Sequence, residues 1–111
     1  MAAGETTVHV TGRGRGGRNQ EFVLAAVERL HALAPEAALA SAGTDGQDGP
    51  TDAAGAIADS ETAVRAERKG LDQARALATN DAYPFFAALG DLIFSGPTGT
   101  NVGDVQILLI A

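Results

Sequence analysis

Apolar residues are spaced along this chain in ways that change from one stretch to the next. Residues 5–11 (Glu-Thr-Thr-Val-His-Val-Thr) are rich in β-branched side chains and roughly alternate, which is typical of a strand. Over residues 20–33 apolar side chains recur at helical spacing, which predicts a helix with Asn19 as its N-cap. Residues 37–42 form a short apolar run between a proline and a glycine, which predicts a buried strand.

Short helices are expected further along the chain. Residues 62–69 should form a helix that ends at Gly70, and Asp72 should cap a further helix. Pro84 is placed to open another helical segment over residues 85–89. Residues 62–89 are therefore predicted to be mainly helical.

Two apolar runs near the end of the chain predict strands, at residues 92–95 and 105–110. We expect them to pair with each other as a hairpin with a long loop. The alanine-rich residues 53–58 indicate one more short helix, beneath the loop that precedes them.

The main elements thus follow the order β-α-β-α-α-β-β. This order predicts an α/β layered domain with a mainly parallel sheet of about four strands, a C-terminal antiparallel hairpin and flanking helices. Residues 1–111 should form this single domain, since a chain of this length seldom holds more than one.

Three glycine-rich polar loops follow predicted strands, at residues 12–20, 43–52 and 96–104. Ligands of open parallel sheets bind beyond the carboxyl ends of the strands, so we expect the three loops to gather on one edge. That edge would carry arginines, carboxylates and backbone N–H groups. Such a surface suits a phosphorylated or carboxylated ligand.

The first loop matches the dinucleotide-binding pattern G-x-G-x-x-G through Gly12, Gly14 and Gly17. It lies between a predicted strand and a predicted helix, and Asp45 ends the next strand, where a ribose-binding carboxylate would lie. However, arginines crowd the turn that must admit a pyrophosphate, and no second unit of the same kind follows. The pattern is therefore not enough by itself to assign a nicotinamide-dependent reductase.

The same loop is rich in arginine, with Arg13, Arg15 and Arg18 close together. The start of the following helix, at Asn19, offers unpaired N–H groups and positive dipole potential. Arginine adds planar, bidentate donors for carboxylate or phosphate. We therefore expect an anion contact at Arg18, with Arg13, Arg15 and Asn19 beside it. The alternative is that these arginines are solvated and pair with acidic residues such as Glu21.

The second loop carries three aspartates, Asp45, Asp48 and Asp52, next to Thr44. Their spacing does not match an EF-hand, but Mg²⁺ needs only one or two protein carboxylates besides substrate phosphates. We expect at least one of the three to contact a metal ion or the substrate, with Thr44 as a further ligand contact. The alternative is that the aspartates only stabilise turns.

The third loop offers two hydroxyls and an amide, from Thr98, Thr100 and Asn101. It is not a Walker A loop, because no Gly-Lys-Ser/Thr follows. If the three loops share an edge, these side chains are expected to contact the same ligand.

Composition narrows the classes of function. The net charge of −6 argues against general binding to nucleic acid or to an anionic membrane. The chain has no cysteine, no stretch that resembles a signal peptide and no apolar run of membrane length, so we expect a cytoplasmic protein. Lys69 is the only lysine and lies in a predicted helix away from the loops. Phosphoryl transfer normally uses a loop lysine, so another domain would have to supply it.

Four ordered motifs resemble the MOFRL domain and together cover essentially the whole chain from Gly4. They are Gly-Gly-Arg-Asn-Gln-Glu-Phe at residues 16–22, Gly-Thr-Asp-Gly with Asp-Gly-Pro-Thr-Asp-Ala-Ala-Gly at 43–46 and 48–55, Asn-Asp-Ala-Tyr-Pro-Phe-Phe at 80–86, and Gly-Pro-Thr-Gly-Thr-Asn-Val at 96–102.

The resemblance implies the C-terminal part of a class II glycerate 2-kinase. Members of that family use ATP and Mg²⁺ to phosphorylate D-glycerate at its 2-hydroxyl, and some carry a hydroxypyruvate reductase name. The ligand, glycerate or another small carboxylate or phosphate, would lie in a cleft between this domain and a larger N-terminal glycerate kinase domain that holds the missing lysine. Arg18 carries over as the catalytic anion contact, and Asp45, Thr98 and Asn101 as ligand contacts.

The chain departs from the family at its start, where Met1-Ala2-Ala3-Gly4 replaces the usual Ser-Gly-Gly before Glu-Thr-Thr. We therefore expect a domain that lacks its N-terminal partner and is inactive alone. Two alternatives stay open. The chain is a stand-alone anion- or nucleotide-binding module without catalysis, or it is part of an NAD(P)H-dependent hydroxypyruvate reductase.

Overall fold

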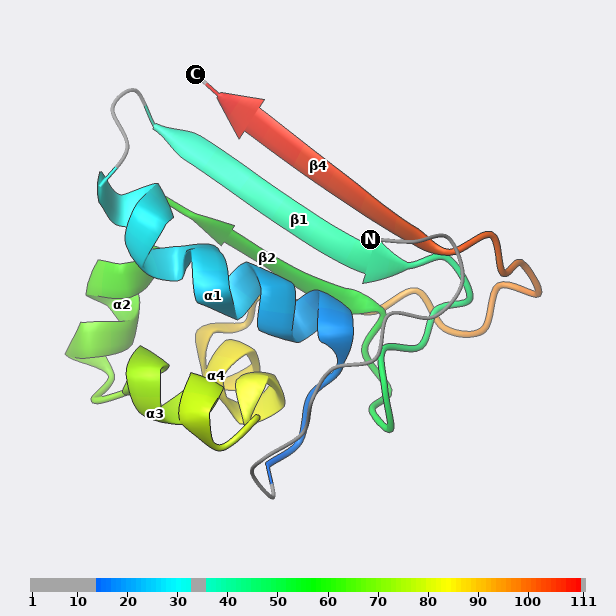
Figure 1. The fold of residues 1–111 in the computed structure, drawn as a ribbon, viewed down its shortest axis with the longest axis horizontal. Helices are drawn as coiled ribbons and strands as arrows, with labels where there is room; N and C mark the ends of the chain where they lie inside the picture. The colour runs from blue at the N-terminus through cyan, green and yellow to red at the C-terminus, as the bar shows by residue number, and fades with distance from the viewer. Residues whose placement is uncertain (1–13, 33–35, 111) are drawn as a thin grey trace.

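The computed structural model describes residues 14–32 and 36–110 (Figure 1). Their elements run in the order α1 (Arg18–Ala32), β1 (Ala37–Gly43), β2 (Gly55–Asp59), α2 (Thr62–Arg68), α3 (Gln73–Ala78), α4 (Ala82–Leu89), β3 (Leu92–Ile93) and β4 (Asp104–Ile110). The strand expected over residues 5–11 lies outside the described residues. No helix of the described part is long and apolar enough to cross a membrane.

The four strands form one sheet in the order β3-β2-β1-β4, and every neighbouring pair is antiparallel. The prediction of a mainly parallel sheet is therefore wrong. A parallel pair needs a long crossover, usually a helix, whereas β1 and β2 are joined by the loop over residues 44–54 alone. The helices still lie against the sheet, so the layered α/β architecture is retained.

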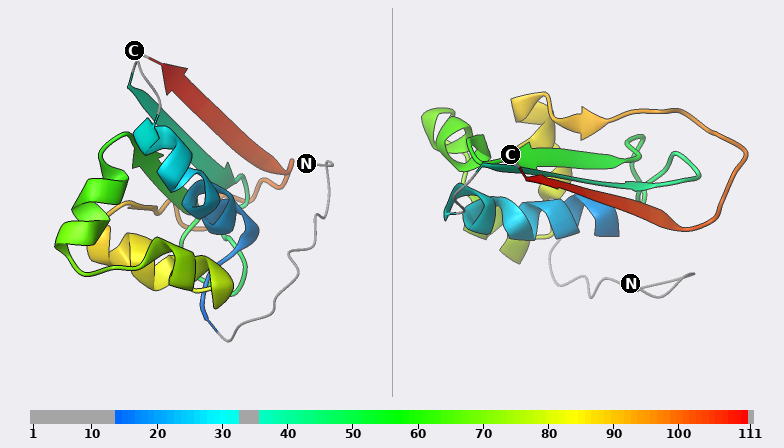
Figure 2. Two further views of the ribbon diagram at one scale, coloured as in Figure 1. Left: turned by 60° about the vertical axis from the view of Figure 1, so that its left-hand side comes forward. Right: turned by 90° about the horizontal axis from the view of Figure 1, so that it is seen from above.

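The expected hairpin between the last two strands is also wrong. β3 pairs with β2 at one edge of the sheet, and β4 pairs with β1 at the other edge. Residues 94–103 cross from one edge to the other around the end of the sheet (Figure 2). Because β4 pairs along all seven residues of β1, it gains far more hydrogen bonds there than the two-residue β3 could offer.

The alanine-rich segment predicted as a helix is the strand β2 instead. Ala56 and Ala58 are buried on one face, and Ile57 is exposed between them. Alanine has a low intrinsic preference for strands, but burial against a neighbouring element overrides that preference. At Gly55 a Cβ would overlap the carbonyl oxygen of Ser41, so glycine is required where β2 first meets β1.

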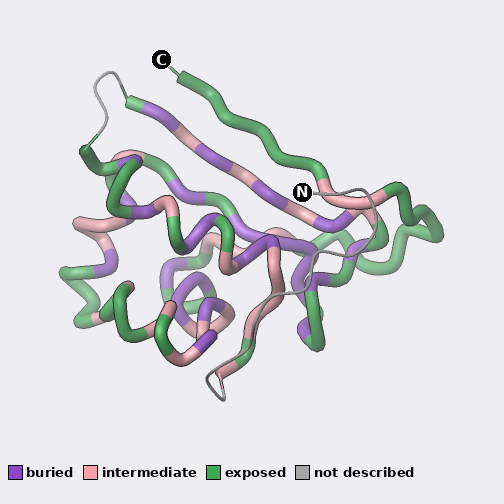
Figure 3. Tube along the Cα trace, viewed as in Figure 1, coloured by how far each residue is buried: buried purple, intermediate pink, exposed green. Residues whose placement is uncertain are grey.

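The core lies between α1 and one face of the sheet (Figures 2 and 3). The helix buries a stripe of apolar residues at the predicted spacing: Val23, Leu24, Val27 and Leu30. Small side chains on β1 and β2 let this helix approach the sheet closely, and Phe85 and Phe86 of α4 complete the core with an edge-to-face ring contact.

The three shorter helices begin and end close to the predicted positions. The side chain of Asp72 caps α3 by accepting from the Arg75 N–H, as expected. Gly70, just beyond α2, has a φ of +71°, a conformation that glycine adopts without strain. Helix α4 begins at Ala82, two residues before the Pro84 start that the sequence predicts.

Candidate functional site

The three glycine-rich loops do meet at one end of the sheet. Gly43, the last residue of β1, pairs with Asp104, the first of β4, and Ala42 pairs with Gly55, the first of β2. Ile93, the last residue of β3, also pairs with Gly55. The prediction that the loops gather is confirmed for their described residues, although antiparallel strands bring them together. We call this region the loop end.

A buried aspartate of the second loop occupies the start of α1. The carboxylate of Asp48, which is 1% exposed, accepts hydrogen bonds from the backbone N–H groups of Asn19 (3.0 Å) and Gln20 (2.8 Å). A Cβ at Gly17 would overlap this carboxyl group, so glycine is needed for the close approach. The positive end of the helix is therefore neutralised by the chain's own carboxylate.

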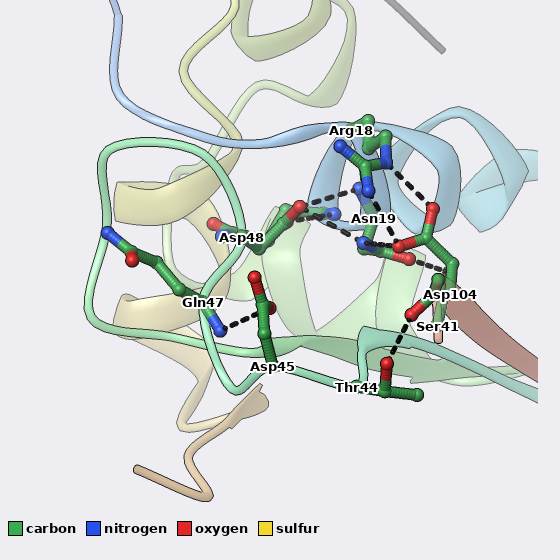
Figure 4. A network of polar contacts seen from close by, with 10 residues as sticks. Arg18, Asn19, Ser41, Thr44, Asp45, Gln47, Asp48 and Asp104 are labelled. Carbon is green, nitrogen blue, oxygen red and sulfur yellow. Dashed lines mark hydrogen bonds and ion pairs between the residues drawn. The ribbon is translucent and has the colours of Figure 1, made fainter. Parts of the chain in front are cut away.

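Asn19 lies inside the first turn of α1, because the helix begins at Arg18 and not after Asn19 as predicted. Its Nδ2 donates to Asp48 (3.1 Å) and to Asp104 (3.2 Å), and its Oδ1 accepts from the Ser41 hydroxyl (2.6 Å). This one buried amide thus joins α1, β1, β4 and the second loop (Figure 4).

Arg18 forms a two-point ion pair with Asp104. Its Nε donates to Oδ2 at 2.7 Å and its Nη2 donates to Oδ1 at 3.0 Å. The side chain of Asp104 is 5% exposed, whereas that of Arg18 is 35% exposed. Desolvation raises the pKa of Asp104, but the hydrogen bonds from Arg18 and Asn19 and the charge of Arg18 outweigh it and hold that pKa below its usual value. The carboxylate therefore stays ionised and keeps the guanidinium in place (Figure 4).

Thr44 holds the second and third loops together. Its N–H and its hydroxyl both donate to the Gly103 carbonyl, at 2.9 and 2.7 Å. Its own hydroxyl oxygen accepts from the Val102 N–H, and its carbonyl accepts from the hydroxyl of Thr98. The predicted contacts Thr98, Thr100 and Asn101 are exposed in this neighbourhood.

The first loop contacts the start of α4, and α4 in turn contacts the second loop. The Arg15 N–H donates to Asp81, and the Arg15 guanidinium lies 4.5 Å from the centre of the Tyr83 ring. The Tyr83 hydroxyl donates to Asp52 at 2.7 Å. This hydrogen bond, followed by desolvation and the charge of Asp52, raises the pKa of Tyr83. Arg13 lies outside the described residues.

The three aspartates proposed as metal ligands have different surroundings. Asp48 is buried under α1, and Asp52 accepts from Tyr83. Asp45 is exposed, with one contact from the Gln47 N–H at 3.1 Å (Figure 4). Across residues 14–32 and 36–110, no group of three or more His, Cys, Asp or Glu side chains is arranged to hold a metal ion.

Sequence reasoning missed two members of this network, Asp104 and Ser41. Asp104 is the last residue of the third glycine-rich loop, so a search for a carboxylate partner of Arg18 at that edge would have found it. No pattern in the sequence marks Ser41, which sits in a run of alanines. Lys69 caps the C-terminus of α2, on the side of the molecule away from the loop end, as predicted (Figure 1).

Comparison with known proteins matches nearly the whole chain to one family. The model of the MOFRL family matches residues 1–104. The D-glycerate 2-kinase of Thermotoga maritima is 51% identical over 107 residues, covering 96% of this chain and 25% of that protein. The glycerate kinase of Danio rerio is 47% identical over 115 residues, covering 99% of this chain and 23% of that protein.

A solved structure shares the fold. The crystal structure of the Thermotoga maritima glycerate kinase superposes with a TM-score of 0.91, covering 97% of this chain and 26% of that chain. This chain thus spans about a quarter of the length of these relatives and corresponds to their C-terminal part. The sequence match and the shared fold agree, and the chain belongs to the MOFRL family.

Proposed function

We propose that this chain is the C-terminal domain of an ATP-dependent D-glycerate 2-kinase, and that its loop end forms one wall of the active-site cleft. The observation that carries the proposal is the 51% identity to a D-glycerate 2-kinase over 96% of the chain. A TM-score of 0.91 against a glycerate kinase supports the same function, because the loops are then carried on the same scaffold.

The proposed reaction breaks the bond between the β- and γ-phosphoryl groups of ATP and forms a bond from phosphorus to the 2-hydroxyl oxygen of glycerate. The hydroxyl proton leaves, and ADP is the second product. Catalysis of such a transfer consists mainly of positioning and of stabilising charge. A domain that offers an arginine but no nearby lysine supplies only part of the positioning and only part of the charge stabilisation.

Arg18 is the residue that we assign to the charge of the reacting groups. Its guanidinium is held by Asp104 through two hydrogen bonds, so its position is set before any ligand arrives. A fixed arginine loses little freedom when it binds an anion. The exposed side chains of Asp45, Thr98 and Asn101 lie around the same end and are the further ligand contacts of this proposal.

The nucleotide and the metal belong to the proposal as well. Mg²⁺ is usually held by one or two carboxylates together with substrate phosphates. Asp45 fits that role among the three aspartates of the second loop, because Asp48 and Asp52 are engaged with Asn19, Gln20 and Tyr83. The remaining ligands would come from ATP and from the N-terminal domain.

The test uses the full-length polypeptide with ATP, Mg²⁺ and D-glycerate, and phosphorus NMR to identify the product. We expect 2-phosphoglycerate from the complete protein and none from the 111-residue chain alone. Arg18→Ala should lower kcat/KM by about a hundredfold, the usual cost of removing one stabilising donor. Arg68→Ala, at an exposed position of α2, is the matched control and should leave activity unchanged. A complete protein that forms no phosphoglycerate would overturn the proposal.

A further inference from the structure

The outer strand β4 is apolar on both of its faces and almost entirely exposed. Leu108 and Ile110 point to the α1 side of the sheet, and Val105, Ile107 and Leu109 point to the opposite side. Ile107 is 51% exposed and Leu109 is 65% exposed. Figure 3 shows this exposure along nearly the whole strand. Strands with apolar residues on both faces are typical of the middle of a covered sheet, not of an edge.

The exposed residues of β4 continue into an open face of the sheet. Residues paired in an antiparallel ladder share a face, and Ala40 pairs with Ile107 on one side and with Ile57 on the other. Ile57 is 42% exposed. We define the open face as Ala40, Ile57, Val105, Ile107 and Leu109. It lies on the side of the sheet opposite α1.

The outer edge of β4 has no partner strand among the described residues. An unpaired edge exposes backbone N–H and C=O groups that can accept another strand, and proteins usually protect such edges with charge, proline or a bulge. Residues 105–110 carry no charge and no proline, and their register with β1 runs without interruption. The strand therefore has none of these protections.

We propose that β4 and the open face dock onto the N-terminal domain of a longer polypeptide, which adds a strand to the β4 edge and covers the open face with apolar side chains. The inference rests on the proposed function only for the existence of that domain. The relatives are about four times as long as this chain, so they hold ample polypeptide to cover this surface. β4 also begins at Asp104, the partner of Arg18, so a domain docked here continues directly into the proposed cleft.

The C-terminal end of β4 favours a positively charged partner. An open hollow there is lined by Leu109 and Ile110 together with the acidic residues Glu36, Asp59 and Glu61. A docking domain should therefore present lysine or arginine near the last residues of β4 and apolar residues along the rest.

Cysteine labelling tests the docking without reference to activity. The chain has no cysteine, so Ile107→Cys places a single thiol of this domain on the open face, and Ala74→Cys places one on exposed α3 as the matched control. Maleimide labelling is followed at each site by peptide mass spectrometry. In the monomeric full-length polypeptide, we expect position 107 to react at least about tenfold more slowly than position 74. In the 111-residue chain, the two positions should react at similar rates.

Equal rates in the full-length polypeptide would overturn the inference. Slow labelling of position 107 in the 111-residue chain would overturn it too, because residues 1–13 or a second copy would then cover the face. Size-exclusion chromatography separates those two occupants. Leu109→Cys repeats the test at a second exposed position in case the first variant folds poorly. Absence of kinase activity in the full-length protein would count against the proposed function but would leave the labelling rates unchanged.

Discussion

The loop end and the outer strand β4 differ in one respect. This chain supplies hydrogen-bond partners for buried polar groups at the loop end, but it does not bury the apolar side chains of β4. At the loop end, the buried polar groups of Asn19, Ser41, Asp48 and Asp104 find partners within the chain. Along β4, large apolar side chains face water on both sides of the strand. A buried polar group without a partner is costly, whereas an exposed apolar residue forgoes burial that another domain can supply. The loop end is therefore preorganised within this chain, whereas β4 keeps large apolar side chains in contact with water.

The largest effect should come from breaking the loop end at Asp48. Asp48→Ala removes the acceptor of three hydrogen bonds from Asn19 and Gln20 and leaves their donors buried. We expect a loss of about 4 kcal/mol in the free energy of unfolding, measured by urea denaturation of the 111-residue chain. The exposed control Asp45→Ala should change it by less than about 0.5 kcal/mol. Equal losses would mean that the network does not stabilise the fold.

A matched pair of leucines compares the covered sheet with the outer strand. Leu39 and Leu108 are register partners on the same face, and they are 8% and 55% exposed. Leu39→Ala should cost about 3 kcal/mol because it leaves a cavity beneath α1. In the 111-residue chain, Leu108→Ala should cost less than about 1 kcal/mol, because little burial is lost. If the two costs prove similar, β4 is already covered within this chain.

Acid should weaken the loop end in a predictable direction. The pKa of Asp104 is lower in the folded chain than its usual value, so its stabilising contribution is complete above that value and is lost as the pH falls through the folded pKa. Asp104→Asn should cost about 1.5 kcal/mol near neutral pH. The difference from the unsubstituted chain should shrink as the pH is lowered, in unfolding curves recorded at several pH values. A difference that does not vary with pH would exclude the ionised pair as its cause.

The smallest effect concerns the exposed margin of the loop end. Tyr83 is the only tyrosine, so ultraviolet absorbance reports its ionisation alone. Its pKa is raised by the hydrogen bond to Asp52, and Asp52→Asn should lower the titration midpoint towards the ordinary value. Asp72→Asn, at the N-cap of α3, is the control and should leave the midpoint unchanged. An unchanged midpoint in Asp52→Asn would show that the hydrogen bond does not persist in solution.

Local patterns identified much of the fold. The helical spacing of apolar residues predicted α1, and short apolar runs predicted β1 and β4 within one or two residues. Capping chemistry placed the start of α3 at Asp72. The alanine-rich β2 was mistaken for a helix, because alanine favours helices locally and only the packing of α1 against Ala56 and Ala58 makes this segment a strand.

The sequence by itself determined the loops, their polar chemistry and the family to which they are similar, because glycines, aspartates and arginines at set spacings carry that information locally. Only the tertiary structure decided that the sheet is antiparallel, that β4 pairs with β1, and that Asp48 and Asp104 occupy the contacts at Asn19 and Arg18. The physical reason is that strand pairing and partly buried ion pairs join residues far apart in the chain. Arg18 and Asp104 are 86 positions apart, and no local pattern records which distant partner each residue will meet.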